Sequence, residues 1–388
     1  MQIPTTIQQT FQVEYNHRLY FTNQLFELTN ALFSNIINSY SPTRTKVLFV
    51  VDEGVSHKFP RLKEQIASYC EHYNSKIELK SIITIPGGEQ VKIGTKYLDT
   101  VLEGINDFHI CRHSFVAVIG GGAVIDMVGY ACAIAHRGVK LLRIPTTVLA
   151  QNDSGVGVKN SINHFGKKNF LGTFALPYAI INDSVFLEAL DQRDWISGIA
   201  EAIKVALIKD KAFYNDIERL SEKLQNRDME SMQYVIYKCA ALHMEHITQG
   251  GDPFENGSSR PLDFGHWAAH KMEHMTNYSI RHGEAVAVGM AIDLVYAQKV
   301  GLITQDVLES ILKVIESVGF DLKLPIPEHQ IDDLINGIEE FREHLGGKLT
   351  ITLISEIGKK LDVHEIDTVK MKEAVSSFLH TKPQSHVN

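Results

Sequence analysis

Three histidines, a glutamate and a lysine in the second half of the chain have the types and spacing of a metal site. Glu201 and Lys204 stand at i and i+3 in AEAIK, and His266 and His270 stand at i and i+4, so each pair shares one face of a helix. His282 follows beyond a turn. Carboxylate and neutral imidazole bind Zn²⁺ where one coordination position stays open for a substrate. Spacing alone favours His266 and His270 together as ligands, although several of the 18 histidines must be structural.

Two features flank these histidines. The segment 250–266 (GGDPFENGSSRPLDFGH) runs into the helix of His266, so Arg260 and Asp263 would face whatever the metal binds. The alternative is a surface loop in which Asp263 only caps the helix. Glu284 either orients a ligand imidazole from behind or is a charge that favours a helix N-terminus.

A glycine-rich run in the first half could bind a diphosphate. GGGAVID (Gly120–Asp126) follows an expected strand and opens an expected helix, so its backbone can approach a phosphate that the helix N–H groups attract. The run lacks the GxGxxG spacing, and a tight strand-to-helix turn is the alternative. Asp52, at the end of an earlier strand, either accepts a bond from a ribose hydroxyl or is a turn aspartate. PGGEQVK (Pro86–Lys92) adds Glu89 and Lys92, or is a solvated turn.

The stretch Ile144–Asn169 (IPTTVLAQNDSGVGVKNSINHFGKKN) combines hydroxyls, amides, Asp153 and three lysines in what we expect to be a loop-rich region. Lys159, Lys167 and Lys168 could neutralise a substrate phosphate. A solvated face is an equally good interpretation for Lys167, whereas Lys159 has uncharged polar neighbours.

The elements that must position these residues divide the chain in two. Short β-branched runs alternate with helical segments up to about residue 180, which predicts a parallel α/β sheet. The expected strands are Lys46–Asp52, Ser114–Gly120, Lys140–Ile144 and Ala179–Asp183, and the expected helices beyond them are Ser197–Lys209, Met229–Thr248, His282–Gly301 and Asp306–Gly319. We therefore predict an α/β domain over 1–183, an all-α domain over 184–380 and a flexible tail over 381–388.

Composition narrows the classes of function. The 388 residues carry a net charge of −8, which disfavours nonspecific binding to nucleic acid or an anionic membrane. The four cysteines stand far apart without a CxxC pair, which fits a reducing compartment. No apolar run is long enough to span a membrane and the N-terminus lacks a signal-peptide pattern, so we expect a cytoplasmic protein.

Taken in order, these strings resemble the 3-dehydroquinate synthase family of sugar phosphate cyclases, from Asp52 to about Gly358. The resemblance lies in an ordered series of motifs: PGGEQVK, GGGAVIDMVGY, HRG, IPTTVLAQNDSGVGVK, NHFGKKN, SGIAEAIKVALI, FGHWAAHKME and HGEAVAVGM. It implies a Rossmann-like domain joined to an α-helical domain, a homodimer, bound NAD⁺ and one Zn²⁺ or Co²⁺.

The resemblance also implies roles for individual residues. Glu201, His266 and His282 match the metal ligands, and His270 matches a histidine that contacts substrate, which displaces it as a ligand. The positions that match cofactor contacts are Asp52, Glu89, Lys92, Gly121, Gly122, Asp126, Thr146 and Thr147. Those that match catalytic or substrate contacts are Asp153, Lys159, Asn163, Lys168, Asn169 and Lys204, together with Arg137, which would reach the substrate phosphate from the partner subunit. Arg260, one place from the family's arginine, is a further candidate for a substrate contact.

The implied reaction joins four steps without net oxidation. NAD⁺ transiently oxidises a ring hydroxyl, phosphate leaves by β-elimination, the ketone is reduced again, and an intramolecular aldol step closes a carbocycle. The metal would polarise the hydroxyl, while the lysines and His270 would stabilise the phosphate.

Four positions depart from the family's pattern for 3-dehydroquinate. That synthase has Arg, Asn and Lys where Ser259, Asp263 and Glu245 stand here, and a C-terminal Lys is missing from FREHLGGKLT; Arg260 is displaced by one place. The missing cations remove an attraction for the carboxylate of the keto-acid substrate, and the added carboxylates repel it. Such like-charge contact costs about 2–5 kcal/mol of binding free energy in a desolvated site. We therefore expect a seven-carbon sugar phosphate without a carboxylate, such as sedoheptulose 7-phosphate, with Asp263 and Glu245 accepting bonds from its hydroxyls.

Three alternatives stay open. The first is 3-dehydroquinate synthase proper, acting on 3-deoxy-arabino-heptulosonate 7-phosphate. The second is a metal-dependent polyol dehydrogenase, which would perform a net oxidation. The third is an inactive paralogue that binds NAD and metal without turnover.

Overall fold

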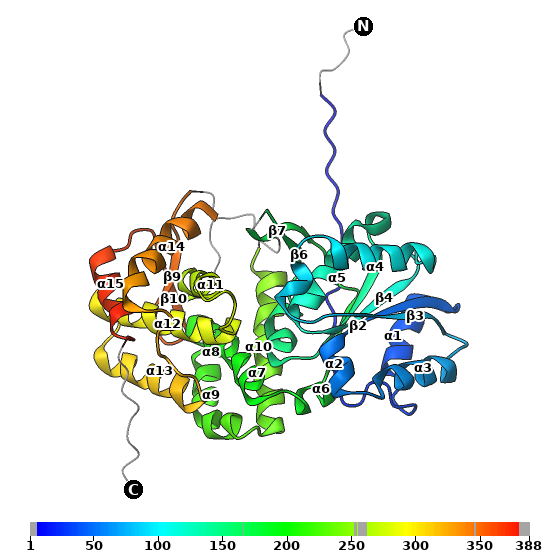
Figure 1. The fold of residues 1–388 in the computed structure, drawn as a ribbon, viewed down its shortest axis with the longest axis horizontal. Coiled ribbons are helices and arrows are strands. Elements are labelled where there is room, and N and C mark those ends of the chain that lie inside the picture. The colour runs from blue at the N-terminus through cyan, green and yellow to red at the C-terminus, as the bar shows by residue number, and fades with distance from the viewer. Residues whose placement is uncertain (1–5, 166, 252–253, 255–261, 345–346, 380–388) are drawn as a thin grey trace.

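The first half of the chain is a parallel sheet with helices on both faces. The computed structural model describes residues 6–165, 167–251, 254, 262–344 and 347–379. Six parallel strands lie in the order β1-β8-β5-β4-β2-β3, and Figure 1 labels β2, β3 and β4 of this sheet. They are β1 (Leu19–Thr22), β2 (Thr45–Asp52), β3 (Ile77–Ile85), β4 (Phe115–Gly120), β5 (Lys140–Pro145) and β8 (Ala179–Asp183). All four predicted strands are present, and β1 and β3 are added at the two edges.

Alternate residues of the strands supply two separate cores. Val47, Phe49 and Val51 of β2 pack on one side, while Leu48 and Val50 pack on the other. Two-sided burial is what near-continuous apolar runs in parallel strands produce. The first core includes α1 (Leu32–Tyr40) and α3 (Leu62–His72), and the second includes α4 (Lys96–Asp107) and α5 (Gly122–Ile134). The short helices of this half are α2 (Glu53–Lys58), η1 (Glu89–Lys92), η2 (Ala135–Arg137) and α6 (Val185–Glu188).

The strand order contains a reversal that positions the predicted nucleotide residues. From β2 the chain moves outward to β3, and from β4 it moves in the opposite direction to β5. Ligands of open α/β sheets bind at the carboxyl ends of strands where the order reverses. Asp52 ends β2 and Gly120 ends β4, so both lie at this reversal.

The second half is mostly helical and forms its own large core. Its helices are α7 (Gln192–Ser197), α8 (Ile199–Lys209), α9 (Lys211–Gln225), α10 (Met229–Gln249), α11 (His266–Met275), α12 (His282–Lys299), α13 (Gln305–Ser317), η4 (Glu328–Gln330), α14 (Ile331–His344) and α15 (Thr368–Ser376). The prediction of an all-α domain needs one correction, because β9 (Ile351–Glu356) and β10 (Lys359–Val363) form an antiparallel hairpin here. The predicted tail 381–388 lies outside the described residues.

The start of helix α11 and helix α12 are in direct backbone contact at two glycines, Gly265 and Gly289. Gly265 precedes α11 with a φ of 77°, and a Cβ there would lie 2.5 Å from the nitrogen of Met290. A Cβ on Gly289 of α12 would lie 2.1 Å from the carbonyl oxygen of Gly265. The buried Asp293 side chain strengthens the junction by accepting hydrogen bonds from Gly265 N (3.0 Å) and Trp267 Nε1 (2.8 Å). This contact sets the position of His266, the first residue of α11.

Asp293 gives the fold a pH dependence that can be measured. Burial raises the pKa of Asp293 to about 7, against the opposing effect of the hydrogen bonds from Trp267 and Gly265. The folded state therefore keeps a proton that the unfolded chain releases near pH 4, so this stabilisation is complete below about pH 4 and is lost as the pH rises through 7. We expect the free energy of unfolding of the metal-free protein, relative to Asp293→Asn, to fall by about 2–3 kcal/mol between about pH 5 and pH 8. Urea unfolding at both pH values measures it, and a constant difference would contradict it.

The stretch 144–169 is more ordered than the loop that the sequence predicts. It contains a π-helical turn, η3 (Ala150–Ser154), and strand β6 (Lys159–His164), which pairs antiparallel with β7 (Lys167–Phe174). Glycines and polar residues concealed this hairpin, because its strands lack a strict apolar alternation. Within the described residues, no helix has the length and apolar character needed to cross a membrane.

Candidate active site

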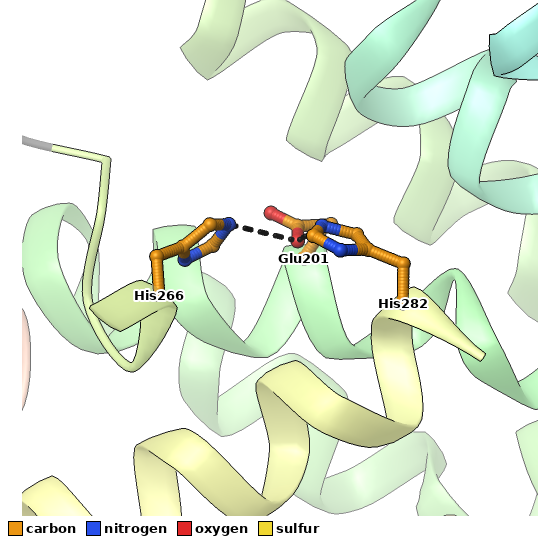
Figure 2. A group of neighbouring side chains, drawn as sticks. All are labelled: Glu201, His266 and His282. Carbon is orange, nitrogen blue, oxygen red and sulfur yellow. Dashed lines mark ion pairs between the residues drawn. The ribbon is translucent and has the colours of Figure 1, made fainter. Parts of the chain in front are cut away.

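Glu201, His266 and His282 come together from three helices. Glu201 lies in the first turn of α8, and the two histidines are the first residues of α11 and α12 (Figure 2). Their ligand atoms all lie within 4.8 Å of one another. Glu201 Oε1 is 3.7 Å from His266 Nε2 and 3.5 Å from His282 Nε2, beyond the range of a good hydrogen bond.

The donor set fits a divalent cation with an open coordination position. Glu201 is fully buried, and its Oε1 has no hydrogen-bond partner among the described residues. His266 Nδ1 is 3.0 Å from the carbonyl oxygen of Phe264, and His282 Nδ1 is 3.2 Å from Glu273 Oε2. In the neutral form of each ring the Nδ1–H donates to an oxygen, which leaves the lone pair of Nε2 for a metal. Two imidazoles and one carboxylate form a catalytic zinc type of ligand set.

Charges around the cluster are strongly coupled. Burial opposes ionisation of Glu201, but Lys204 and His282 outweigh it and lower the pKa of Glu201 to about 2. Burial, followed by the charge of Lys204, holds the pKa of His266 well below its ordinary value. Burial would lower the pKa of His282 too, but Glu273 and Glu201 raise it to about 9. The buried site therefore keeps Glu201 anionic and His266 neutral, the forms that bind a metal.

His270 lies beside the three residues and not among them. It is exposed on α11, with its ring centroid 5.4 Å from that of His266 and 5.9 Å from that of His282. His270, Glu273 and His282 also have ligand atoms within 4.8 Å of one another, but Glu273 already accepts bonds from His282 and Lys168. The structure therefore favours Glu201, His266 and His282 over the pair that spacing alone nominated.

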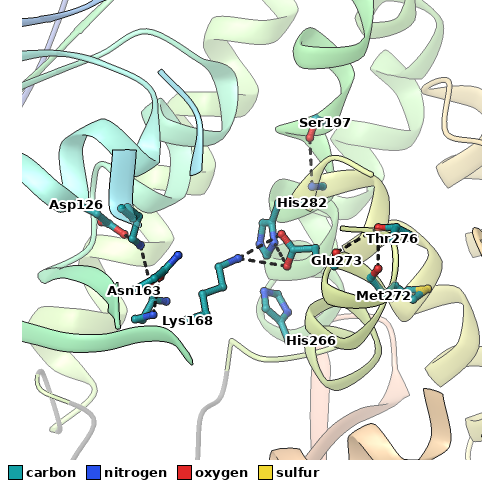
Figure 3. A network of polar contacts seen from close by, with 12 residues as sticks. Asp126, Asn163, Lys168, Ser197, His266, Met272, Glu273, Thr276 and His282 are labelled. Atoms are coloured by element: carbon teal, nitrogen blue, oxygen red, sulfur yellow. Dashed lines mark hydrogen bonds and ion pairs between the residues drawn. The ribbon is translucent and has the colours of Figure 1, made fainter. Parts of the chain in front are cut away.

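Glu273 is a residue that the sequence argument missed. It is almost fully buried on α11 and accepts hydrogen bonds from His282 Nδ1 and, at 3.3 Å, from Lys168 Nζ of the β6–β7 hairpin (Figure 3). It thus connects the α/β half to a candidate metal ligand. The available signal was its place seven residues after His266, on the same helix face.

Glu284, which the sequence offered as a residue that orients a ligand imidazole, instead caps helix α12. Its carboxylate accepts a hydrogen bond from Arg281 N at 2.9 Å and completes a capping box at the start of α12. It also pairs with Arg193. The charge therefore belongs to the helix terminus, which was the other interpretation of this residue.

Glu273→Gln tests this assignment against a matched control. The substitution removes the charge behind His282, and outer carboxylates of this kind are worth about 10–100-fold in metal affinity. We expect that loss of Zn²⁺ affinity, measured by competition with a chromophoric chelator. Glu284→Gln retains a capping side chain and should change the affinity less than about threefold. Equal effects of the two variants would contradict an orienting role for Glu273.

A second buried cluster surrounds Lys204. Lys204 forms an ion pair with Glu201, and His243 Nδ1 of α10 is 3.1 Å from Asp153 Oδ1. Burial would lower the pKa of Lys204, but Glu201 and Asp153 raise it further than burial lowers it. Asp263, half-buried before α11, adds its charge to Lys204. The arrangement holds Lys204 as a cation beside the candidate metal position.

Two of the predicted substrate residues are not placed in these clusters. Glu245 is exposed on α10, and among the described residues its charge acts on Lys209. Arg260 lies outside the described residues. Of the acidic departures from the family pattern, Asp263 alone has a neighbour in the Lys204 cluster.

The predicted cofactor residues gather at the strand reversal. Asp52 caps α2 by accepting from Gly54 N at 2.8 Å, and a Cβ on Gly87 would touch its carboxylate. Gly121 faces Thr147, and a Cβ on Gly122 would lie 2.5 Å from Ser154 Oγ. Thr146 is buried and its N–H bonds to Gly120. Gly122 therefore has no room for a side chain beside Ser154, as close approach of a ligand to the backbone requires, whereas a Cβ on Gly121 would make only an ordinary contact with Thr147 at 3.6 Å.

A buried lysine connects this cradle to the hairpin. Lys92 Nζ donates to Asp126 Oδ2 at 2.8 Å and to Asn169 Oδ1 at 2.5 Å. Asn163 Oδ1 accepts from the backbone of Asn169 at 2.8 Å. The carboxylate of Glu89 acts on the charge of Lys168, which lies between the two halves.

Arg143 of β5 holds the loop that carries Asp153 and Lys159. The guanidinium is fully buried and donates to the carbonyl oxygens of Gly155 (2.9 Å) and Gly157 (2.5 Å) and to Asn160 Oδ1 (2.7 Å). Lys159 itself is exposed at the start of β6. The sequence shows Arg143 only as a charged residue within an apolar strand, so this role could not be predicted from it.

Arg137 lies far from these residues within one chain. It follows the C-terminus of α5, whereas the predicted nucleotide cradle is at the N-terminus of that 13-residue helix. A helix of this length spans about 20 Å. Arg137 is exposed, with a φ of 63°. Within one chain Arg137 is therefore not part of the clusters around Glu201 and Lys204.

The fold and this site together define the class of the protein, an enzyme of the sugar phosphate cyclase type with a Rossmann-like half and a helical half. Models of the N-terminal and C-terminal regions of 3-dehydroquinate synthase match residues 82–197 and 198–342. The 3-dehydroquinate synthase of Shewanella frigidimarina (strain NCIMB 400) is 30% identical over 342 residues, 86% of this chain and 90% of the relative. The chain belongs to the 3-dehydroquinate synthase family.

Solved structures confirm the fold. ValA, a 2-epi-5-epi-valiolone synthase from Streptomyces hygroscopicus subsp. jinggangensis 5008 with NAD⁺ and Zn²⁺ bound, superposes with a TM-score of 0.86 at 25% identity, over 96% of this chain and 99% of ValA. A 2-deoxy-scyllo-inosose synthase complexed with carbaglucose-6-phosphate, NAD⁺ and Co²⁺ matches with a TM-score of 0.73 at 21% identity, over 93% and 96% of the two chains. The second likeness concerns the fold alone.

Proposed function

We propose that the protein is a homodimeric sugar phosphate cyclase that converts a seven-carbon ketose phosphate without a carboxylate, of the sedoheptulose 7-phosphate type, into a carbocycle with loss of phosphate. The single observation that carries the activity is the buried group of Glu201, His266 and His282 with its unpartnered carboxylate oxygen, next to Lys204. The binding of NAD⁺ with Zn²⁺ by ValA supports the same pair of cofactors here.

Each cofactor has residues that would hold it. Glu201, His266 and His282 would bind Zn²⁺ or Co²⁺, and Asp52, Gly121, Gly122 and Thr146 would border NAD⁺. When bound, NAD⁺ would supply an oxidation that is reversed within one turnover, and the metal would polarise the hydroxyl concerned.

The chain's own residues would then manage charge and protons. Lys204 stays cationic between Glu201 and Asp153, so it can hold a substrate oxygen that becomes negative. Asp153, whose Oδ1 lies 3.1 Å from His243 Nδ1, can accept a hydrogen bond from a substrate hydroxyl. Lys168 and the exposed His270 stand where the two halves meet and can bind the phosphate that leaves.

The substrate preference rests on Asp263. Its carboxylate acts on Lys204 at the position where the family's synthase for the keto-acid substrate has an amide. A carboxylate of the substrate brought to this place would meet a like charge, whereas a hydroxyl could donate to Asp263. The superposition on ValA agrees with this preference, although 3-dehydroquinate synthases are the relatives with higher identity.

Assays of phosphate release from a substrate panel test the proposal. Purified protein with NAD⁺ and Zn²⁺ or Co²⁺ should release phosphate faster from sedoheptulose 7-phosphate than from 3-deoxy-arabino-heptulosonate 7-phosphate, and NMR should show a carbocyclic product. Asp263→Asn should shift the ratio of the two kcat/KM values toward the keto acid by at least about tenfold, about 1.4 kcal/mol. Glu245→Gln, at an exposed site, should leave the ratio unchanged.

Other outcomes assign the other functions. Faster release from the keto-acid phosphate by the wild-type protein would make it a 3-dehydroquinate synthase. Accumulation of NADH without phosphate would indicate a polyol dehydrogenase. Binding of NAD⁺ and Zn²⁺ without turnover of any sugar phosphate would indicate a binding paralogue.

A further inference from the structure

A segment near the N-terminus forms an arm that leaves the body of the molecule. Residues 6–16 are all exposed and carry no helix or strand, and Figure 1 shows them running away from the α/β half. The arm is anchored at its base, where His17 Nε2 lies 2.8 Å from the carbonyl oxygen of Val156 and the carbonyl of Arg18 accepts from Ile180 N. Eleven extended residues reach roughly 36 Å.

The arm has the pattern of a β-strand with one apolar face. Phe11, Val13 and Tyr15 alternate with Gln12 and Glu14. The three apolar side chains are 85%, 58% and 62% exposed. Period-two alternation of this kind is typical of a strand that buries one face, yet within this chain that face packs against nothing described.

A matching free edge stands close to the base of the arm. Among the described residues β7 pairs only with β6, so its outer edge presents unpaired backbone groups. Phe165, Phe170 and Phe174 of this hairpin are exposed as well. An exposed strand edge with aromatic side chains is a template for a further strand.

We propose that the arm of one subunit adds as a strand to the free edge of β7 in a second copy of the chain, and that the exchange is reciprocal. We place the acceptor in the partner because the arm points away from the body of its own chain, and two-fold symmetry makes such an exchange reciprocal. Charge agrees with this pairing: Glu14 is the one charged residue of segment 6–16, and the exposed Lys167 stands on β7.

The exchange places the partner beside the candidate active site. The same strand β7 carries Lys168, which bonds to Glu273, and Asn169, which bonds to Lys92. A third strand would hold this two-stranded hairpin in place, since an isolated two-stranded hairpin is marginal in water. The inference concerns assembly and does not depend on which sugar phosphate is turned over.

Photo-crosslinking tests the acceptor without assuming a register. We replace Phe11 by the photoreactive p-benzoylphenylalanine in the full chain and mix ¹⁴N- and ¹⁵N-labelled subunits before irradiation. The expected result is a crosslinked peptide of mixed isotope content that joins residue 11 to residues 167–174. The same photoreactive residue at the exposed Leu361 of β10 is the control and should not reach this hairpin. Crosslinks confined to a single isotope label after complete subunit exchange, crosslinks between two arms, or crosslinks to another surface would each overturn the proposal.

A pair of charge-matched variants tests the energetics. Phe11→Glu with Val13→Glu alters the apolar face of the arm, and Gln8→Glu with Gln12→Glu adds the same charge to polar positions. Because all four side chains are exposed in the single chain, neither variant should affect its folding. Sedimentation equilibrium should show a dimer dissociation constant raised at least about tenfold for the first variant and less than about threefold for the second. Equal constants would overturn the proposal even if the protein were an active dimer.

Discussion

Glu201→Gln is expected to leave the protein folded but without bound metal, and to lower the turnover of its sugar phosphate by about 10³-fold. The amide keeps the volume of the side chain but removes the buried negative charge that faces two imidazole nitrogens. Polarisation by a bound metal is worth several kcal/mol at the transition state, and about 4 kcal/mol corresponds to a thousandfold. Elemental analysis of the purified variant and phosphate release under saturating NAD⁺ measure the two effects.

The control for this prediction separates metal loss from misfolding. Glu222→Gln makes the same chemical change at an exposed position of α9 and should retain stoichiometric zinc. Zn²⁺ or Co²⁺ should reactivate the wild-type protein after chelation but not the Glu201 variant, whose circular dichroism should still be that of a folded protein. Stoichiometric zinc in Glu201→Gln would show that the metal binds elsewhere.

Arg143→Met is expected to lower the free energy of unfolding by about 3 kcal/mol and to reduce kcat/KM at least about 100-fold. The substitution leaves the carbonyl oxygens of Gly155 and Gly157 buried without donors, and each such loss costs about 1–3 kcal/mol. The substitution also removes the desolvation penalty of the buried guanidinium, which offsets part of this loss of stability. Catalysis should suffer more than stability implies, because the same loop positions Asp153 and Lys159.

Denaturant unfolding and steady-state kinetics on the Arg143 variant measure these effects. Arg219→Met removes an exposed arginine that pairs with Asp216, and it should cost less than about 1 kcal/mol. If Arg143→Met and Arg219→Met had equal unfolding midpoints, the loop that carries Asp153 and Lys159 would be stable without the guanidinium of Arg143.

Much of the architecture could be predicted from local patterns. Apolar runs such as KVLFVVD identify central strands because both faces of the sheet are covered, and the amphipathic or buried periodicity of α8, α10, α12 and α13 identifies helices within a few residues. The hairpins β6–β7 and β9–β10 escaped prediction because one strand of each, β7 or β10, is largely exposed, so its apolar alternation is weak.

The candidate site was predictable only where spacing within one helix carried the information. Glu201 with Lys204 could be grouped in this way, but His282 joins His266 only through the crossing of α11 and α12, which no local pattern reveals. Family resemblance supplied that grouping. Glu273, His243 and Arg143 were missed because their roles depend on partners 9 to more than 100 residues away in sequence or on carbonyl groups, which a residue-type pattern does not show.

The backbone contact between Gly265 and Gly289 has an evolutionary consequence. Because no side chain of any size fits at that crossing, drift in the surrounding core cannot gradually slide one imidazole relative to the other. A change of substrate on this scaffold that keeps both glycines would therefore alter side chains at the rim, such as the one at residue 263, and would leave the spacing of the two histidines unchanged.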